Sequence, residues 1–402
     1  MNVPKGWVLK KFGEVASSSK GKMPKTLGDE KSKKHSIPYV NIKAFEKKIF
    51  DQFTDGEKCT LCEIDDVLLV WDGARAGLSG RGIKGAVGST LARIDSEVSD
   101  KGYLYYFLQT KYRQLNTNPR GVGIPHIEPT LLWGFDYPIP PLSEQQRIVA
   151  KIEELFSDLD KAVESLKKAQ AQLKTYRQAV LKYAFEGRFT HKNIKPGQLP
   201  EGWKWVKLGD IMEDISYGTS KKCSYTKKGS PVLRIPNIIG GVIDDEDLKF
   251  AEFTAEEKKH YSLRDGDLLI IRSNGSVSIV GKTALVSDRH SGYLFAGYLI
   301  RLRFTKETYP KFVSCFLGST TARTQIESVA KSTSGVNNIN SKEISRLAIP
   351  FTDCDQQKFV IQEIETRLSE ADNLEKTIIQ SLEKADATRQ SILKKAFEGR
   401  LV

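Results

Sequence analysis

Cysteine and histidine are scarce in this chain of 402 residues, which contains five of each. Zinc sites need pairs of these residues at short spacings. Cys59 and Cys62 form one such pair, but no second pair stands at a spacing that would complete a site. An odd number of cysteines in a long chain is typical of a reducing compartment rather than of a disulfide framework. The sequence therefore predicts no metal site and a cytoplasmic location.

Long apolar runs are also absent. No stretch of about 18 apolar residues could span a bilayer, and the opening MNVPKGWVLKKFG lacks the apolar segment of a signal peptide. Apolar residues still make up 39% of the chain, including 18 Phe and 14 Tyr, so ordinary cores can form. We expect a soluble chain with no membrane partner.

Motifs for cofactor chemistry are incomplete. Gly80, Gly82 and Gly85 have a dinucleotide-like spacing, but no amphipathic helix follows them. In GSVSIVGKT (275–283), five residues separate the glycines where a phosphate-binding loop needs four. The IPPL sequence (139–142) lacks the polar and aromatic neighbours of an amino-group methyltransferase motif, and nothing indicates a nuclease metal site. We therefore expect a non-catalytic chain without a cofactor of its own.

An internal duplication dominates what is present. RQAVLKYAFEGR (177–188) matches RQSILKKAFEGR (389–400) at nine of twelve positions, 212 residues apart. PKGWVLKKFGEV (4–15) similarly resembles PEGWKWVKLGDI (200–211). A repeat of about 200 residues has the size of a domain, so the sequence predicts two similar modules.

Each module is followed by a long amphipathic stretch. In 143–186, apolar or small residues recur at steps of four and three, which predicts a heptad seam; they are Ile148, Ile152, Leu155, Leu159, Ala162, Leu166, Ala169, Leu173, Tyr176, Val180 and Tyr183. The second stretch has a period nearer 3.6 and a less regular seam, with Val360, Ile364, Leu368, Ala371, Leu374, Ile378, Leu382, Ala385 and Ile392. We expect the two helices to pair as an antiparallel coiled coil with a pseudo-twofold axis.

The starts of these helices set the register of the repeat. Pairing Gln145 and Gln146 with Gln356 and Gln357 changes the offset from 212 to 211. This pairing predicts one inserted residue near Gln356.

Positive charge indicates a nucleic-acid partner. The net charge is +12 and the pI about 9.2. Lysine-rich loops recur at equivalent places (17–36 and 216–230), either as solvated connections or as phosphate-binding loops. The candidate phosphate contacts are Lys20, Lys22, Lys25, Lys221 and Lys222.

Polar side chains that could read bases follow the strand-like runs VLLV and LLII. Arginine and asparagine form two-pronged hydrogen bonds with guanine and adenine edges, although the same residues also commonly stabilise turns. The first candidates are Arg75, Arg81, Lys84, Arg272, Asn274 and Lys282. A second set lies in NPRGVGIPHIE (118–128) and STSGVNNINSKE (332–343), which share a Gly-Val and lead into the repeated helices, and comprises Arg120, His126, Asn337 and Asn338.

The duplicated order of these parts resembles the specificity subunit of type I restriction-modification systems. Two modules each open with Pro-x-Gly-Trp, and the long helix after each ends in Ala-Phe-Glu-Gly-Arg. The resemblance spans the whole chain and implies an α+β fold with two mixed α/β target recognition domains. The implied boundaries are 1–142 and 191–352 for these domains, and 143–190 and 353–402 for the two helical regions.

The resemblance also implies function and partners. Each module would read one half of a bipartite asymmetric sequence in double-stranded DNA, and the helices would set the gap between the halves. Two methyltransferase subunits would dock on the helices, and two restriction/translocase subunits would join them. S-adenosylmethionine, ATP and Mg would all lie on these partners.

Two other classes of function stay open on the residues alone. A coiled-coil scaffold joining two protein-binding modules would explain the repeat and the helices, but not the basic loops. A self-contained DNA methyltransferase or nuclease would need a cofactor or metal motif that is incomplete here.

Overall fold

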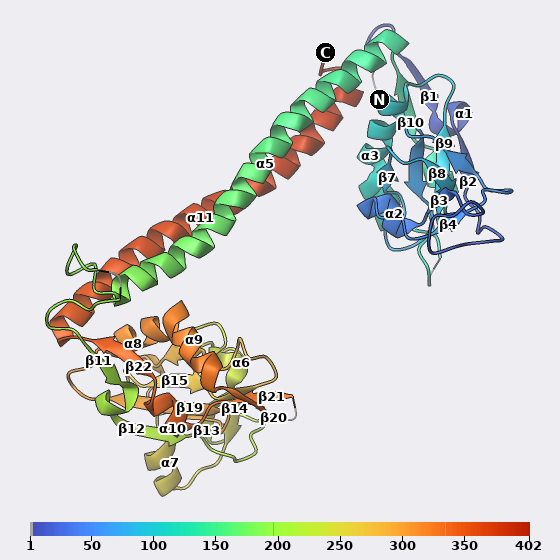
Figure 1. Ribbon diagram of the computed structural model, residues 1–402. Helices are drawn as coiled ribbons and strands as arrows, with labels where there is room; N and C mark the ends of the chain where they lie inside the picture. The colour runs from blue at the N-terminus through green and yellow to red at the C-terminus, as the bar shows by residue number, and fades with distance from the viewer. Residues whose placement is uncertain (1–2, 122, 196, 334) are drawn as a thin grey trace. The chain divides into compact units, whose positions relative to one another are not determined.

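The computed structural model describes residues 3–121, 123–195, 197–333 and 335–402. The chain forms two compact units, the first from Met1–Lys167 with Ile379–Val402 and the second from Lys168–Ile378. Two 44-residue helices, α5 (Leu142–Phe185) and α11 (Cys354–Phe397), each contribute one part to each unit (Figure 1). Within the described ranges, no helix has the length and apolar character needed to cross a membrane.

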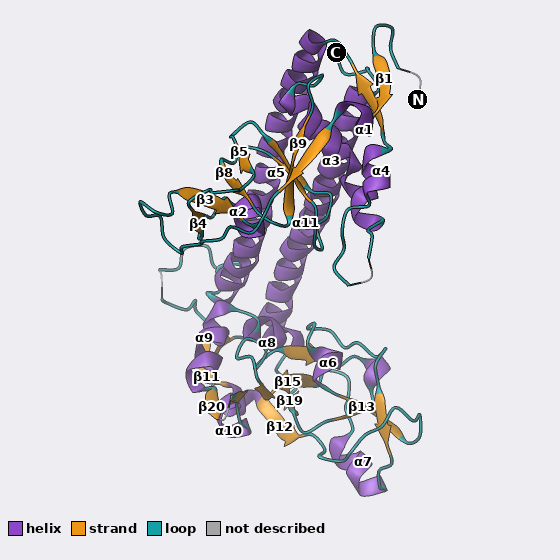
Figure 2. Cartoon of the chain, turned by 90° about the vertical axis from the view of Figure 1, so that its right-hand side faces the viewer, coloured by secondary structure: helices purple, strands orange, loops and turns teal. Residues whose placement is uncertain are grey.

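The first unit contains two four-stranded sheets and a two-stranded ribbon. The sheet β2-β9-β6-β7 is antiparallel, β4-β3-β8-β5 is mixed, and β1 pairs with β10. The strands are β1 (Val8–Lys11), β2 (Ser17–Lys20), β3 (Ile37–Val40), β4 (Phe53–Thr54), β5 (Leu61–Cys62), β6 (Val67–Val70), β7 (Ser79–Gly80), β8 (Gly85–Val87), β9 (Leu91–Asp95) and β10 (Asp136–Ile139). The shorter helices are α1 (Phe12–Val15), α2 (Ile42–Lys47), α3 (Lys101–Thr117) and α4 (Pro129–Trp133) (Figure 2).

The second unit repeats this plan. The sheet β12-β19-β15-β17 is antiparallel, β14-β13-β18 is mixed, and β11 pairs with β22; a further sheet, β16-β21-β20, is added. The strands are β11 (Lys204–Lys207), β12 (Met212–Tyr217), β13 (Ser230–Leu233), β14 (Lys249–Ala251), β15 (Leu268–Ile271), β16 (Ser273–Asn274), β17 (Thr283–Leu285), β18 (Leu294–Phe295), β19 (Leu299–Phe304), β20 (Lys331–Thr333), β21 (Val336–Asn338) and β22 (Ala348–Phe351). The helical segments are η1 (Leu208–Ile211), α6 (Ile235–Ile238), α7 (Ala255–Tyr261), η2 (Asp288–His290), α8 (Pro310–Leu317), α9 (Thr320–Val329) and α10 (Ser341–Ser345).

The strands β6 and β15 organise the cores because both of their faces are buried. Successive side chains of a strand point to opposite faces. Val67 and Leu69 enter the core that contains the apolar side chains of α3, whereas Leu68 and Val70 enter a second core that contains those of α2. The LLII run of β15 divides in the same way between two cores of its unit. Continuous apolar runs are the expected sequence for strands covered on both faces.

The two long helices pack antiparallel within each unit. In the first unit, Ile152 and Phe156 of α5 share a core with Leu393 and Phe397 of α11. In the second unit, the later part of α5 shares a core with the beginning of α11. Equivalent ion pairs join the helices, Arg389 with Asp160 in the first unit and Arg177 with Asp372 in the second. These pairs repeat with the 212-residue offset seen in the sequence.

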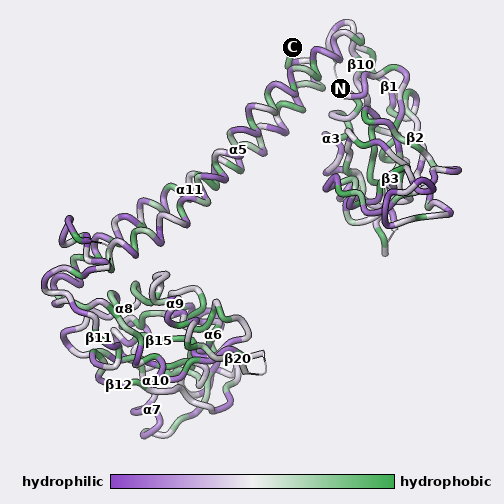
Figure 3. The backbone as a smooth tube through the Cα atoms, in the orientation of Figure 1, coloured by the Kyte–Doolittle hydropathy of each residue, from purple (hydrophilic) through white to green (hydrophobic). Residues whose placement is uncertain are grey.

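The expected seam is wrong in register toward the end of α5. Tyr176 and Tyr183 are exposed, whereas Arg177, Val180 and Ala184 turn toward α11. Leu374 of α11 is likewise exposed. A straight helix has 3.6 residues per turn, so a strict heptad drifts away from the contact line. Residues 212 positions apart in the two helices have similar burial, so the second seam is as regular as the first. Figure 3 shows hydrophobic and hydrophilic positions alternating along both helices.

The predicted insertion near Gln356 is also wrong. Gln145 and Gln357, 212 positions apart, are both buried and make matching bonds. The Gln145 amide donates to the carbonyl of Pro140 at 2.9 Å, and the Gln357 amide donates to that of Thr352 at 2.7 Å. The offset of 212 therefore continues through the starts of both helices.

Each module is closed by a contact between its Pro-x-Gly-Trp start and a helix end. In the second unit, Gly187 has φ +71° and lies so close to Pro200 that a Cβ would collide with the proline ring. Gly399 stands against Pro4 in the same way in the first unit. The Trp203 indole donates to Gln356 at 3.0 Å, and the equivalent Trp7 donates to Glu144 at 3.1 Å. A module start thus contacts the end of one long helix and the beginning of the other.

Replacing Gly187 by Ala tests this closure against a matched control. Gly202 also has a left-handed backbone, at φ +81°, but nothing lies within 4 Å of its would-be Cβ. Gly202→Ala should cost about 1 kcal/mol, from the backbone alone. Gly187→Ala should cost about 1–3 kcal/mol more, because the methyl group overpacks against Pro200. Urea unfolding of both variants measures the difference, and equal midpoints would contradict the closure.

Candidate nucleic-acid interface

Some of the predicted DNA-binding residues lie together where the central strand of each module ends. In the first unit, Asp72 lies two residues after the end of β6 and forms a β-bridge with His126, which forms a second bridge with Arg120. In the second unit, Ser273 pairs with Asn338 and Asn274 pairs with Asn337. The first unit thus brings together Arg120 and His126 of the second set, whereas the second unit brings together residues from both sets of base-reading candidates.

Backbone hydrogen bonds show that the two places are equivalent. Ile127 N–H donates to the carbonyl of Trp71 at 2.9 Å, and Ile339 N–H donates to that of Arg272, also at 2.9 Å. Trp71 thus occupies the position of Arg272, and it follows that Asp72 matches Ser273 and His126 matches Asn338. Gly21 and Gly218 make matching bonds to Leu91 and Leu299, which pairs the preceding residues, Lys20 and Tyr217. The backbone is the same while the side chains differ.

The first-unit cluster consists of Lys20, Asp72, Arg120 and His126. Asp72 accepts from Lys20 Nζ at 2.8 Å and lies 2.7 Å from His126 Nδ1. Partial burial would raise the pKa of Asp72, but the bonds from Lys20 and His126 outweigh it and hold this pKa below its ordinary value. The Asp72 side chain is only 15% exposed, while Lys20 and His126 are about half exposed. The carboxylate therefore orients two donors that face solvent.

The second-unit cluster consists of Tyr217, Arg272, Asn274, Asn337 and Asn338. The Arg272 guanidinium lies 4.7 Å from the centre of the Tyr217 ring, and its Nε donates to Asn338 Oδ1 at 3.4 Å. The Asn274 side chain accepts from Ser276 N–H at 2.9 Å, and the Asn337 side chain donates to the Gly275 carbonyl at 3.1 Å. These two asparagines stabilise the loop, whereas the Arg272 guanidinium contacts the Tyr217 ring and Asn338.

Sequence reasoning missed Asp72 and Tyr217. The alignment of DDVLLVWDG with GDLLIIRSN could have indicated Asp72. It places Asp72 opposite Ser273, between the predicted base-reading residues Arg272 and Asn274. Tyr217 precedes Gly218, at which a Cβ would collide with the carbonyls of Phe295 and Ala296. A glycine required by such a close approach marks the end of the neighbouring strand.

The other predicted residues lie outside the clusters. Arg75 pairs with Glu46 at 3.1 Å and Lys84 with Glu63 at 2.8 Å. Arg81 pairs with Glu153 of α5 and lies over two tyrosine rings of α3. Lys221 pairs with Glu257 at 2.9 Å, and Lys282 donates to the Ile239 carbonyl at 3.4 Å. Three further lysines are exposed, namely Lys22, Lys25 and Lys222.

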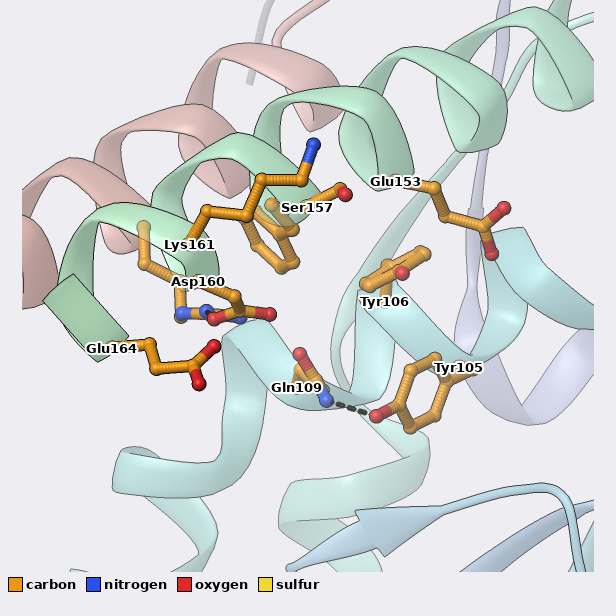
Figure 4. Close-up of a pocket in the computed structure, with 10 residues that line it drawn as sticks. Tyr105, Tyr106, Gln109, Glu153, Ser157, Asp160, Lys161 and Glu164 are labelled. Atoms are coloured by element: carbon orange, nitrogen blue, oxygen red, sulfur yellow. Dashed lines mark hydrogen bonds and ion pairs between the residues drawn. The ribbon is translucent and has the colours of Figure 1, made fainter.

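A polar cleft of about 550 Å³ lies between α3 and the long helices in the first unit (Figure 4). Its lining is Tyr105, Tyr106 and Gln109 from α3, Glu153, Phe156, Ser157, Asp160, Lys161 and Glu164 from α5, and Arg389 from α11. Arg389 lies over the Phe156 ring at 4.2 Å and binds Asp160. Small-molecule pockets are mostly apolar, so this open and charged surface better fits a protein segment. In the part of the chain that the structure describes, no group of three or more His, Cys, Asp or Glu residues could hold a metal ion.

Comparison with known proteins identifies the family. Residues 4–175 and 200–384 match the type I restriction modification DNA specificity domain, and the chain belongs to this family. It is 32% identical over 305 residues to the EcoKI specificity subunit of Escherichia coli K12, which covers 75% of this chain and 65% of that subunit. It is 26% identical over 413 residues to the MjaVIII specificity subunit of Methanocaldococcus jannaschii, covering 100% of this chain and 94% of that one.

Solved structures have the same fold. A chain from a study of complex assembly and conformational transition of the type I R-M system matches with a TM-score of 0.76 at 19% identity, over the full length of both chains. The HsdS subunit of Thermoanaerobacter tengcongensis matches with a TM-score of 0.62 at 21% identity, over 100% of this chain and 98% of that one. The expected fold of two mixed α/β modules, each followed by a long helix, is thereby confirmed.

Asp72→Asn tests the first-unit cluster through its pH dependence. The lowered pKa means that the folded state favours the carboxylate. The stabilisation is present above the unfolded pKa of about 4 and is lost as the pH falls through the lower folded pKa. We expect wild type to unfold at higher urea concentration than the variant at pH 7, and the difference to shrink toward zero in acid. Equal midpoints at pH 7 would contradict the role of Asp72.

Proposed function

We propose that this chain is the DNA-specificity subunit of a type I restriction-modification complex and that each module reads one half of a bipartite asymmetric target. The observation that carries the proposal is the duplicated site, in which an equivalent backbone presents different side chains. Identical side chains would read the same bases twice, whereas Lys20, Asp72 and His126 differ chemically from Tyr217, Ser273 and Asn338. Two unlike readers on like modules fit an asymmetric sequence.

Phosphate binding and base reading are assigned to different residues. Phosphate contacts position a protein on DNA, and base-edge contacts give specificity. The exposed Lys22, Lys25 and Lys222 suit phosphates, since they are mobile point charges. The two clusters at the strand ends suit base edges. We place the recognition domains at 1–142 and 191–352, with helical regions 143–190 and 353–402, whose length sets the gap between half-sites.

The chemistry is assigned to partner chains. Two methyltransferase subunits, carrying S-adenosylmethionine, dock on the helical regions, and the charged cleft beside α3 is a suitable surface for one of them. Such a subunit takes its target base out of the DNA stack. Two restriction/translocase subunits supply the ATP- and Mg-dependent steps. Since the target is chromosomal or invading DNA, the complex acts in the cytoplasm.

Module exchange tests the function. Residues 1–142 are replaced by the first module of another member of the family, and both chains are co-produced with the methyltransferase subunit. Selection from a randomised duplex pool should return two short blocks with a fixed gap for each complex. Only one block should change, because each module reads its own half. Changes in both blocks, or no enriched sequence from an intact complex, would contradict the proposal.

Lys222→Ala tests the phosphate assignment. Losing one phosphate contact should weaken binding to target and non-target duplexes about equally and lower the slope of log affinity against log salt by about 1. Binding is measured between 50 and 200 mM salt, as conventional for such titrations. A loss confined to the target duplex would instead make Lys222 a base-reading residue.

A further inference from the structure

Arg272 differs from the other strand-end arginines predicted to bind DNA. Arg75 and Arg81 are neutralised by Glu46 and Glu153. Arg272 is half-buried, and among the described residues no carboxylate lies within ion-pair distance of it. A partly buried cation without an acidic partner is costly. The charge of Arg272 is therefore not neutralised by a described residue of the chain.

The guanidinium is already oriented for a two-acceptor ligand. The Tyr217 ring supports its plane at 4.7 Å, and Asn338 Oδ1 accepts from Nε. In the described part of the chain neither Nη group donates to a protein acceptor. The two Nη groups thus form a free fork, which is pre-organised and loses little entropy on binding.

The surroundings favour a base edge over a phosphate. Tyr298, whose carbonyl accepts from the Arg272 N–H, is 64% exposed, and Val336 of β21 is also exposed. The guanidinium itself meets an aromatic ring, Tyr217, and an amide oxygen, Asn338 Oδ1, rather than a cluster of cations. Phosphate contacts in this chain are better served by the exposed lysines of 216–230.

Resting on the proposed function, we infer that Arg272 is a specificity-determining residue that reads a guanine in the half-site of the second module. Guanine alone presents two acceptors, N7 and O6, side by side in the major groove, and they match an arginine fork. The equivalent position of the first module is Trp71, which has a single N–H and cannot form such a fork. This arginine–guanine contact therefore has no counterpart at the equivalent position of the first module.

The test uses the full chain in complex with its methyltransferase subunit. Pool selection first gives the wild-type target. Arg272→Lys keeps the charge but removes the fork, so it should relax the preference for guanine at one position of one block by about 5- to 150-fold. The other block should be unchanged.

A double-mutant cycle locates the contact on the base. A duplex with 7-deazaguanine at that position lacks the N7 acceptor. The wild-type complex should bind this duplex more weakly than the normal target, and Arg272→Ala, which has no side-chain donor, should bind both about equally, because the modified atom and the fork belong to one interaction. If 7-deazaguanine lowered the affinity of the variant by the same factor as that of the wild type, the two changes would be additive and the inference would be overturned.

Tyr217 provides a matched pair of variants. Its hydroxyl accepts from Ser341 N–H at 2.9 Å, so Tyr217→Phe loses this bond but keeps the ring under Arg272. Tyr217→Leu removes the ring. We expect guanine discrimination to survive in the first variant and to fall in the second, with unfolding midpoints confirming that both are folded. Equal discrimination in both would argue against positioning by the ring.

The outcomes separate this inference from the proposed function. A wild-type complex that selects no bipartite sequence overturns both. Two blocks without a guanine that depends on Arg272 overturn the inference alone. A uniform loss of affinity across all sequences in Arg272→Lys would make Arg272 a phosphate contact and likewise overturn it.

Discussion

The contact between a helix-ending glycine and the proline of a module start is the constraint on which the two units depend. The ring of Pro200 packs directly against the backbone of Gly187, and the ring of Pro4 packs against that of Gly399, because glycine has no Cβ to collide with the ring. The tryptophan three residues after each proline then reaches the beginning of the other long helix. The start of each module is therefore fixed to both helices, in addition to the core in which Phe397 packs on Tyr103 and Phe185 on Phe312. The repeated AFEG and Pro-x-Gly-Trp sequences are the two sides of one contact.

Anchoring at the edges leaves the interior of each module free to vary. The ribbons β1-β10 and β11-β22 bring the two ends of a module together, and buried Gln145 and Gln357 fix the adjacent helix starts. Between these points, β6 and β15 need only apolar residues, and the loops after them are positioned by backbone bonds from Ile127 and Ile339. Side chains at Trp71 and Arg272 can then differ without disturbing the fold. A recognition module requires this separation of support from specificity.

Sequence analysis correctly predicted the elements that depend on local pattern and on repetition. The duplication indicated two modules and both long helices, since nine identities in twelve positions cannot result from helical composition alone. The predicted seam was wrong at Tyr176 and Tyr183, because the buried face of a long helix depends on its exact pitch. The predicted insertion was wrong because two adjacent glutamines allowed two alignments. Asp72 was missed because its partners, Lys20 and His126, lie about fifty residues away on either side and meet it only through tertiary pairing. The individual DNA contacts stay predictions.

Net charge indicated a nucleic-acid partner, but the arrangement of charges says more about how DNA would be bound. Some basic side chains of the loops are already paired at the surface, Lys84 with Glu63 and Lys221 with Glu257. Exposed pairs of this kind contribute little, about 0–1 kcal/mol each. A lysine could therefore leave its carboxylate partner for a DNA phosphate at little cost in free energy. Before DNA binds, the ion pair keeps the lysine in place. Arg272 represents the opposite case, because an aromatic face and an amide oxygen orient it without neutralising its charge. A paired lysine is suited to any DNA, whereas an oriented and unneutralised arginine is suited to a particular base.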